Sequence, residues 1–218
     1  MRINKLLSER LGMSRRKADG FLLTNKVHVN GVPAQQGQDV SDADTVTIND
    51  KPLPPKAAYT YLLLNKPVGY VCSHDGQGSA TVYDLLPPEY QHLNPVGRLD
   101  KDSSGLLLLT NDGGLHQSLT HPSYQKIKEY QVTLNKPLTP NDQALIKKGV
   151  LLDDGISALE LKLRTKDSQG WQITMHEGRN RQIRRTFEAL GYKVTKLHRT
   201  KFGDYCLNNL SSGSFVLM

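Results

Sequence analysis

The sequence predicts an α+β fold in which a small N-terminal α/β domain precedes a larger α+β domain with a mixed, mainly antiparallel sheet. Segments with strand-like alternation of apolar residues recur along the chain and are separated by only two or three helical patterns. The polar, proline-rich stretch 51–56 is typical of an extended linker. We therefore expect two domains, covering residues 1–57 and 58–218.

The small domain is expected to contain two helices and a short, hairpin-rich sheet. Apolar residues at helical spacing over 3–11 predict the first helix, which Gly12 would end, and Ser14 is a suitable N-cap for the second. Alternation over 27–31, which ends in an Asn-Gly turn pair, and over 46–48 predicts the strands.

The first turn of the second helix is strongly basic. Arg15, Arg16 and Lys17 follow the capping serine directly. Positive charge at this end of a helix opposes the helix dipole, so a bound phosphate would be a natural compensating anion. An ordinary solvated face is the alternative interpretation.

The larger domain shows patterns for several strands and helices. The turn 166–170 would join the last two strands in a hairpin. The expected strands cover 61–64, 106–109, 128–134, 159–163 and 171–175. The expected helices cover 81–86, 115–119 and 140–148.

The charge of the chain favours a polyanionic partner. The formal net charge is +7, and it is unevenly distributed: residues 58–125 carry an excess of acidic side chains, whereas the segments before and after them are basic. A mildly acidic centre between two basic flanks suits a protein that grips a nucleic-acid backbone on both sides of a site.

The cysteines and the N-terminus bear on the compartment. Cys72 and Cys206 lack the spacing of a disulfide framework or a zinc site, and we expect both to be buried thiols. The charged N-terminus is unlike a signal peptide, and no apolar run approaches membrane-spanning length. We therefore expect a soluble, cytoplasmic protein that binds neither membrane nor metal.

The most informative stretch places reactive groups against a buried strand. Asp100 and Asp102 follow Arg98 and precede a Ser-Ser-Gly bend and the apolar run 106–109. An enzyme that needs one carboxylate in a dry pocket would place it in this way. In the alternative interpretation Asp100 caps a turn and pairs with Arg98.

A second informative stretch covers residues 177–187. Asn180 can cap a helix whose apolar stripe includes Ile183, and Gly191 would end it. Four arginines load positive charge onto the first turns of this helix, and RNA phosphates or a protein carboxylate could offset it. A solvent-facing basic helix is the alternative. The four are Arg179, Arg181, Arg184 and Arg185.

Four ordered motifs together resemble a known family. They are Leu-Asn-Lys-Pro-x-Gly-Tyr from 64, Gly-Arg-Leu-Asp-Lys-Asp-Ser-Ser-Gly from 97, Lys-Glu-Tyr from 128 and Glu-Gly-Arg-Asn-Arg-Gln-Ile-Arg-Arg from 177. The chain resembles the RsuA-like ribosomal-RNA pseudouridine synthases, the branch that also includes RluB, RluE and RluF. Residues 1–50 resemble an S4 RNA-binding domain. The resemblance implies isomerisation of a uridine in ribosomal RNA without a metal or an organic cofactor, and we expect a monomer.

The resemblance also implies roles for individual residues. Asp100 matches the catalytic aspartate, which either adds to ribose C1′ or removes the C2′ proton, and Arg184 matches the arginine that pairs with it. Tyr130 would stack on the target base and accept the C5 proton, directly or through water. Ile183 would pack beneath the base, and Arg98 would enter the RNA stack that the uridine leaves.

Further residues are expected to bind RNA or to support the motif. Lys66 would reach a phosphate or brace the Asp100 loop, and Asp102 would serve as a turn-stabilising acceptor. The last motif is closer to that of the large-subunit enzymes, but the modified uridine cannot be read from the sequence. The expected RNA-binding residues are Lys66, Arg98, Ile183, Arg179, Arg181, Arg185, Arg15, Arg16 and Lys17.

Three other functions fit parts of the sequence. A phosphatase with an aspartate nucleophile would place its apolar strand before the acidic pair, not after it. A calcium loop beginning at Asp100 would need Glu at its twelfth position, where Asn111 stands. A non-catalytic S4-type ribosome-associated or assembly protein would explain the charge but not the Asp100 motif.

Overall fold

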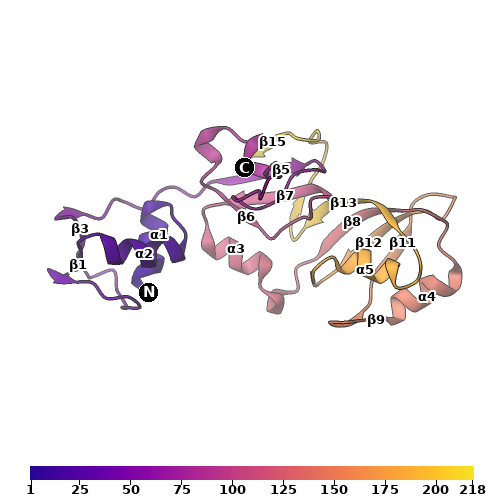
Figure 1. The fold of residues 1–218 in the computed structure, drawn as a ribbon, viewed down its shortest axis with the longest axis horizontal. Coiled ribbons are helices and arrows are strands. Elements are labelled where there is room, and N and C mark those ends of the chain that lie inside the picture. Colours follow the sequence, from indigo (N-terminus) through magenta and orange to yellow (C-terminus); the bar gives the residue numbers. More distant parts are fainter.

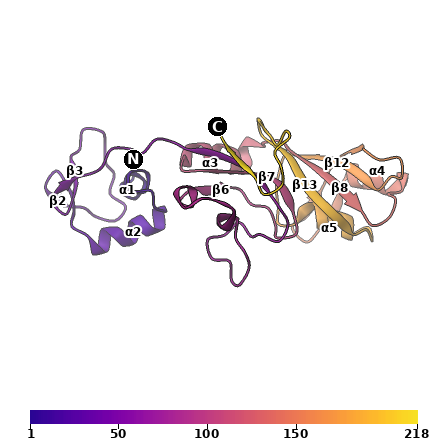
Figure 2. The same cartoon turned by 90° about the horizontal axis from the view of Figure 1, so that it is seen from above.

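The computed structural model describes residues 1–218, except for the side chain of Pro122. Figure 1 shows an elongated molecule with the first helices and short strands at one end and a large sheet filling the rest. Figure 2, from above, shows the same separation, with a thin connection between the two parts. The observed α+β architecture with a mixed sheet confirms the predicted fold class.

The N-terminal part has a core of its own. Helices α1 (Ile3–Leu11) and α2 (Arg15–Thr24) pack on a four-stranded sheet in the order β2-β1-β3-β4. Ser14 caps α2, as predicted, by accepting a hydrogen bond from the backbone of Lys17 at 3.2 Å. The strands are β1 (Val27–Val29), β2 (Val32–Pro33), β3 (Val46–Ile48) and β4 (Lys51–Pro52).

The predicted linker begins too early. Lys51 and Pro52 form β4, which pairs with β3, and Leu53 packs against the N-terminal core. The sequence pattern missed this strand because Pro52 is normally depleted in strands and is tolerated here at the edge of a sheet. The division of the chain near residue 57 and the S4 assignment of this part stay predictions.

A nine-stranded mixed sheet forms the larger part. Its main order is β11-β12-β8-β13-β7-β5-β15, and all neighbours are antiparallel except β13 and β7. The strands of this order are β5 (Tyr61–Lys66), β7 (Ser104–Thr110), β8 (Lys128–Leu134), β11 (Glu160–Leu163), β12 (Gly170–Met175), β13 (Val194–Phe202) and β15 (Phe215–Leu217).

Shorter strands and helices surround this sheet. Strands β6 (Asn94–Val96) and β14 (Tyr205–Cys206) pair at its sides, and β9 (Val150–Leu152) and β10 (Gly155–Ser157) form a separate hairpin. The helices are α3 (Gly113–Thr120), α4 (Pro140–Lys148) and α5 (Gln182–Glu188), with 3₁₀ turns η1 (Val82–Leu85), η2 (Pro88–Tyr90) and η3 (Pro122–Tyr124).

Several expectations need correction. Residues 81–86 form a 3₁₀ turn and not an α-helix, and Cys206, in the short β14, is exposed while Cys72 is buried. Asn180 does not cap α5; the residue before the helix is Arg181, which adopts a left-handed conformation with φ 45°. The central strand β13 was not predicted at all, because its apolar residues do not alternate cleanly with the polar ones.

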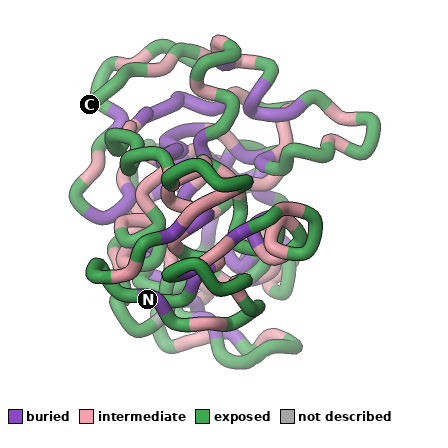
Figure 3. Tube along the Cα trace, turned by 90° about the vertical axis from the view of Figure 1, so that its left-hand side faces the viewer, coloured by how far each residue is buried: buried purple, intermediate pink, exposed green. Residues whose placement is uncertain are grey.

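The leucine run 106–109 lies at the centre of the core. All four side chains are completely buried. Leu107 and Leu109 join one apolar cluster, and Leu106 and Leu108 join another on the opposite face of the sheet. Both faces of β7 are therefore covered, which explains a continuous apolar run in place of alternation. Figure 3 shows the buried residues, in purple, along the inner strands of the trace.

Gly105 permits the one parallel contact in the main sheet. It has φ 107° and pairs with Arg199 of β13. A Cβ atom at this position would lie 2.2 Å from the carbonyl oxygen of Arg199. Because only glycine leaves this space free, the bend after Ser104 lets β13 lie directly against the start of β7.

Over residues 1–218, every helix is too short or too polar to cross a lipid bilayer.

Candidate active site

A cleft of about 480 Å³ opens beside the Asp100 loop. Its walls come from the loop 97–103, the end of α3 with the residues that follow it, strand β8, the segment 176–183 that leads into α5, and strand β13. The sequence-predicted residues that line it are Arg98, Asp100, Tyr130, Arg179, Arg181 and Ile183. The tertiary structure thus brings two distant motifs to one cavity.

Lys66 braces the Asp100 loop from beneath. Its side chain is completely buried, and its Nζ atom donates hydrogen bonds to the carbonyl oxygens of Pro67 at 3.0 Å, Asp100 at 3.0 Å and Ser103 at 2.7 Å. All three donors of the ammonium group are thereby used. Burial lowers the pKa of Lys66. Of the two roles expected for Lys66, the geometry fits bracing of the Asp100 loop. It does not fit contact with an RNA phosphate, because the buried ammonium group donates all of its hydrogen bonds inside the protein.

The Asp100 carboxylate is only partly shielded. Its side chain is 35% exposed, and its Oδ2 atom lies 3.5 Å from Nη1 of Arg181. The dry pocket expected for this group is therefore not observed, because the carboxylate is open to the cleft. The side chain of Arg98 is exposed and lines the same cleft, and among the described ion pairs Asp100 contacts Arg181 and not Arg98.

Asp102 joins two arginines of the second motif. Its carboxylate accepts two hydrogen bonds from Arg181, both at 3.1 Å, and lies 3.2 Å from Nε of Arg184. Burial alone would raise the pKa of Asp102, but the hydrogen bonds from Arg181 and the charges of both arginines lower it. Asp102 is therefore more than a turn-stabilising acceptor.

The expected partner of Arg184 needs correction. Arg184 makes its ion pair with Asp102 and not with Asp100, and it also donates hydrogen bonds to the carbonyl oxygens of Asp102 at 2.7 Å and Val194 at 2.9 Å. The reason is its place in α5. Arg184 lies in the first turn of the helix and donates a hydrogen bond to Val194 of β13, whereas Arg181 precedes the helix in a left-handed conformation and reaches Asp100.

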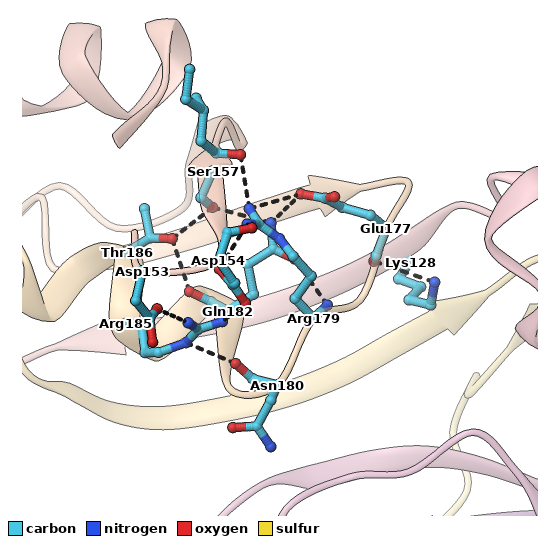
Figure 4. A network of polar contacts seen from close by, with 11 residues as sticks. Lys128, Asp153, Asp154, Ser157, Glu177, Arg179, Asn180, Gln182, Arg185 and Thr186 are labelled. Atoms are coloured by element: carbon cyan, nitrogen blue, oxygen red, sulfur yellow. Dashed lines mark hydrogen bonds and ion pairs between the residues drawn. The ribbon is translucent and has the colours of Figure 1, made fainter. Parts of the chain in front are cut away.

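Arg179 and Arg185 hold the β9–β10 hairpin (Figure 4). Arg179 contacts Asp154 at 2.8 Å and the carbonyl oxygen of Ile156 at 2.8 Å, and Arg185 contacts Asp153 and Asp154. Protein carboxylates thus offset the basic start of α5, which was one of the two anions expected there. RNA phosphates would have to compete with these carboxylates for both arginines.

Gln182 is the buried centre of the same network. Its amide nitrogen donates to the hydroxyl of Ser157 at 3.1 Å and to the carboxylate of Glu177. Its amide oxygen accepts from the backbone of Arg179 at 3.1 Å, and Thr186 donates to its carbonyl at 2.8 Å. These bonds join the hairpin, the loop and the helix, and they fix the segment that carries Arg181 to the cleft (Figure 4).

Tyr130 and Ile183 face the cleft from the apolar core. Tyr130 lies on β8 and Ile183 on α5, both are buried, and both belong to the largest apolar cluster. Arg15, Arg16 and Lys17 lie elsewhere, exposed at the start of α2, outside the residues that line the cleft.

The sequence reasoning missed three cations of the cleft, Lys126, Lys128 and Arg199. Arg199 is 2% exposed on β13, and Lys128 is half-buried at the start of β8. Burial lowers the pKa of Lys128, and the nearby charge of Arg199 lowers it further. Arg199 stands among the polar residues Thr195, Lys196, His198, Thr200 and Lys201 of β13, so the local sequence carried no signal that its side chain is buried. Among the side chains that the structure describes, no three His, Cys, Asp or Glu residues gather as a metal site would require.

Comparisons with known proteins agree with this geometry. Residues 60–189 match the RNA pseudouridylate synthase family. The chain is 37% identical over 219 residues to ribosomal small subunit pseudouridine synthase A of Pasteurella multocida, covering 99% of this chain and 94% of the relative. It is also 37% identical over 220 residues to ribosomal large subunit pseudouridine synthase B of Bacillus subtilis, covering 97% and 89%.

A solved structure extends the likeness to the whole fold. The crystal structure of a pseudouridylate synthase covers 100% of this chain and 96% of its own length, with a TM-score of 0.72 and 33% sequence identity. The family match, the full-length relatives and the shared fold lead to one conclusion: this chain belongs to the RNA pseudouridylate synthase family.

Proposed function

We propose that this protein isomerises a uridine of ribosomal RNA to pseudouridine, with Asp100 as the catalytic carboxylate. The observation that carries the proposal is the position of Asp100 in a cleft that also holds Tyr130 and Ile183. An aromatic ring and an aliphatic side chain suit a flat pyrimidine, and the cationic walls suit its phosphates. The names of the two relatives at 37% identity support ribosomal RNA as the substrate.

The base must leave its helix before the reaction. Chemistry on a paired uridine requires rotation of the nucleotide into a pocket, and an arginine can take the vacated place in the stack. Arg98 is exposed and lines the cleft beside Asp100, which suits this role. The uracil ring would then lie against Tyr130, with Ile183 packed beneath it.

The chemistry requires an anionic carboxylate near the sugar. Asp100 would either add to C1′ or remove the proton at C2′, and in both cases the bond from C1′ to uracil N1 breaks. The uracil turns and C5 bonds to C1′, while the bond from Asp100 to C1′ breaks or Asp100 returns the proton to C2′. A base then removes the C5 proton, a role for which Tyr130 is placed, directly or through water, and N1 takes up a proton. Arg181, 3.5 Å from Asp100, favours its ionised form.

Arg184 and Asp102 would hold other groups of the site in place. Arg184 lies between the Asp102 carbonyl and Val194, so it joins the Asp100 loop to β13. Asp102 holds Arg181 in two hydrogen bonds and leaves it within reach of Asp100. In this arrangement neither residue needs to touch the substrate, and both set the distance between Arg181 and Asp100.

The N-terminal part would increase affinity for RNA. Its exposed basic turn at Arg15, Arg16 and Lys17 offers charge to a phosphate at the start of α2.

An RNA-modifying enzyme of this kind would act in the cytoplasm, and we expect it to act as a monomer. The closer match of its last motif favours a large-subunit RNA, although relatives named for either subunit are equally identical.

The test is direct conversion of unmodified RNA. Purified protein is incubated separately with small-subunit and large-subunit ribosomal RNA transcripts, and pseudouridine is mapped chemically. We expect one site in one of the two RNAs, formed by the wild-type protein and not by Asp100→Asn, which should still bind RNA. Binding without any conversion by the wild-type protein would instead support a non-catalytic RNA-binding protein. Conversion by Asp100→Asn at the wild-type rate would refute the role of Asp100.

A further inference from the structure

Several cations beneath or beside the cleft have no carboxylate partner among the described side chains, and three of them donate hydrogen bonds to backbone carbonyl groups. Within the side chains that the structure describes, Lys66, Lys128 and Arg199 make no ion pair within 4.0 Å, although the arginines of the second motif are all paired. Their hydrogen-bond acceptors are backbone carbonyl groups. This part of the cleft therefore carries positive charge that the protein itself does not neutralise.

Arg199 is the most confined of the three. On β13 it pairs with Tyr130 of β8 on one side and with Gly105 of β7 on the other. Directly paired residues of a sheet project to the same face, so the Arg199 side chain lies beside Tyr130. Its Nε atom donates to the carbonyl oxygen of Leu106 at 2.8 Å, and its guanidinium carbon lies 4.9 Å from the centre of the Phe202 ring.

One end of this guanidinium has no partner. Nη2 of Arg199 is buried and makes no hydrogen bond to any described residue. A buried, unpaired donor on a charged group is costly and is uncommon unless a ligand or a reaction uses it. Because Arg199 lines the cleft, a group that enters the cleft could satisfy this donor.

The connectivity of a flipped nucleotide indicates which of its groups can reach Arg199. A flipped nucleotide stays joined to both neighbours, so its phosphates remain near the mouth of a pocket and only the base enters deeply. Arg98 is exposed, whereas Arg199 is 2% exposed beside Tyr130. The group that meets Arg199 is therefore the base, whose acceptors are the O2 and O4 atoms of uracil.

We propose that Arg199 is a catalytic residue that stabilises negative charge on uracil while the bond from C1′ to N1 is broken. The electron pair of that bond moves into the ring and spreads over N1, O2 and O4. A guanidinium donor held ready for one of these oxygens stabilises the departing anion without reorganisation. The same pair then forms the new bond from C5 to C1′ as the bond from Asp100 to C1′ breaks or as C2′ regains its proton. The C5 proton leaves to a base and N1 takes up a proton, so atoms and electrons balance.

This proposal rests on the proposed function, and the experiment separates the two. Arg199→Met keeps an unbranched apolar stem and removes the charge, and Arg199→Lys keeps the charge. Lys201→Met is the matched control, because Lys201 lies on the same strand, contacts Glu129 at 3.7 Å and does not line the cleft. Each variant is measured for single-turnover conversion of the ribosomal RNA at saturating enzyme, RNA affinity at several salt concentrations, and thermal unfolding.

We expect Arg199→Met to convert RNA about a hundred-fold or more slowly, as when one preorganised donor to a reacting oxygen is lost. Its RNA affinity and salt dependence should stay within about two-fold of wild type, and Arg199→Lys should recover at least ten-fold of the lost rate. Lys201→Met should convert RNA at the wild-type rate. If Arg199→Met fails to fold, Arg199→Gln, which keeps donors without charge, should show the same slow conversion.

Three results would overturn the proposal. One is an unchanged rate in Arg199→Met. Another is weaker, less salt-dependent RNA binding with a normal rate at saturation, which would mean a phosphate contact. The third is equal loss in Arg199→Lys and Arg199→Met, which would mean that the side chain serves packing. Absence of conversion by the wild-type protein would refute the proposed function itself, whatever the variants do.

Discussion

Gly105→Ala should disrupt both the fold and the cleft. The new methyl group would lie 2.2 Å from the carbonyl oxygen and 2.6 Å from the nitrogen of Arg199, where ordinary contact begins at 3.4 Å. Both atoms belong to the backbone, so β7 and β13 would have to separate by about 1 Å, since packed interiors do not absorb such overlap. Alanine would also adopt an unfavourable conformation at φ 107°.

The two effects can be separated by a control. Gly213 also has a positive φ, 82°, but a Cβ atom there meets no atom within 4 Å. Gly213→Ala should therefore show only the conformational cost, about 1–2 kcal/mol. Gly105→Ala adds strain at the strand contact and the loss of one or two sheet hydrogen bonds at about 1 kcal/mol each, so we expect about 3–6 kcal/mol.

Urea unfolding followed by circular dichroism measures the difference. For a protein with about 5–15 kcal/mol of stability, the expected loss in Gly105→Ala lowers the unfolding midpoint by a large fraction. Conversion of RNA should fall as well, because Arg199 and the Asp100 loop meet at this strand contact. Equal unfolding midpoints for the two alanine variants would refute the argument that Gly105 is needed for the approach of β13.

Three further predictions follow from the site and the domain arrangement. Lys66→Met should lower the free energy of unfolding by about 2–4 kcal/mol and slow conversion. It removes the side-chain donor from the carbonyl groups of Pro67 and Ser103, and it leaves the Asp100 carbonyl with only the backbone N–H of Ser103. Urea unfolding and single-turnover rates check this, and wild-type values for both would contradict it. Asp102→Asn should cost stability at neutral pH but not in acid: the folded pKa of Asp102 is lowered, so its contribution is present above the ordinary value of 3.8 and is lost as the pH falls through the folded pKa. Unfolding measured from pH 7 to pH 2 should show the two curves converge, and a constant difference would exclude this linkage. Removal of residues 1–57 should leave a folded sheet but weaken RNA binding and reduce its salt dependence, as measured by filter binding; equally tight binding would argue against an RNA-binding role for this part.

Much of the fold could be predicted from local pattern. The strand 128–134 has the predicted bounds, and helix 140–148 lies between its proline and its glycine as expected. Such elements are readable because a covered strand or helix face repeats with a fixed period. Strand β13 could not be predicted in this way, because most of its residues are polar. It is a strand because it pairs with β7 on one side and β8 on the other, and both are distant in the sequence.

The candidate site divides along the same line. The sequence by itself predicted which motifs carry the chemistry, Asp100 with its loop and the arginines of 177–187, because residue types and spacing are read directly along the chain. Only the tertiary structure decided their partners: Arg181 lies near Asp100, Arg184 contacts Asp102, and Lys66 is enclosed beneath the loop. The physical reason is that ion pairs and buried donors are settled by distance and solvent exclusion, and both arise only when β7, β13 and α5 pack together.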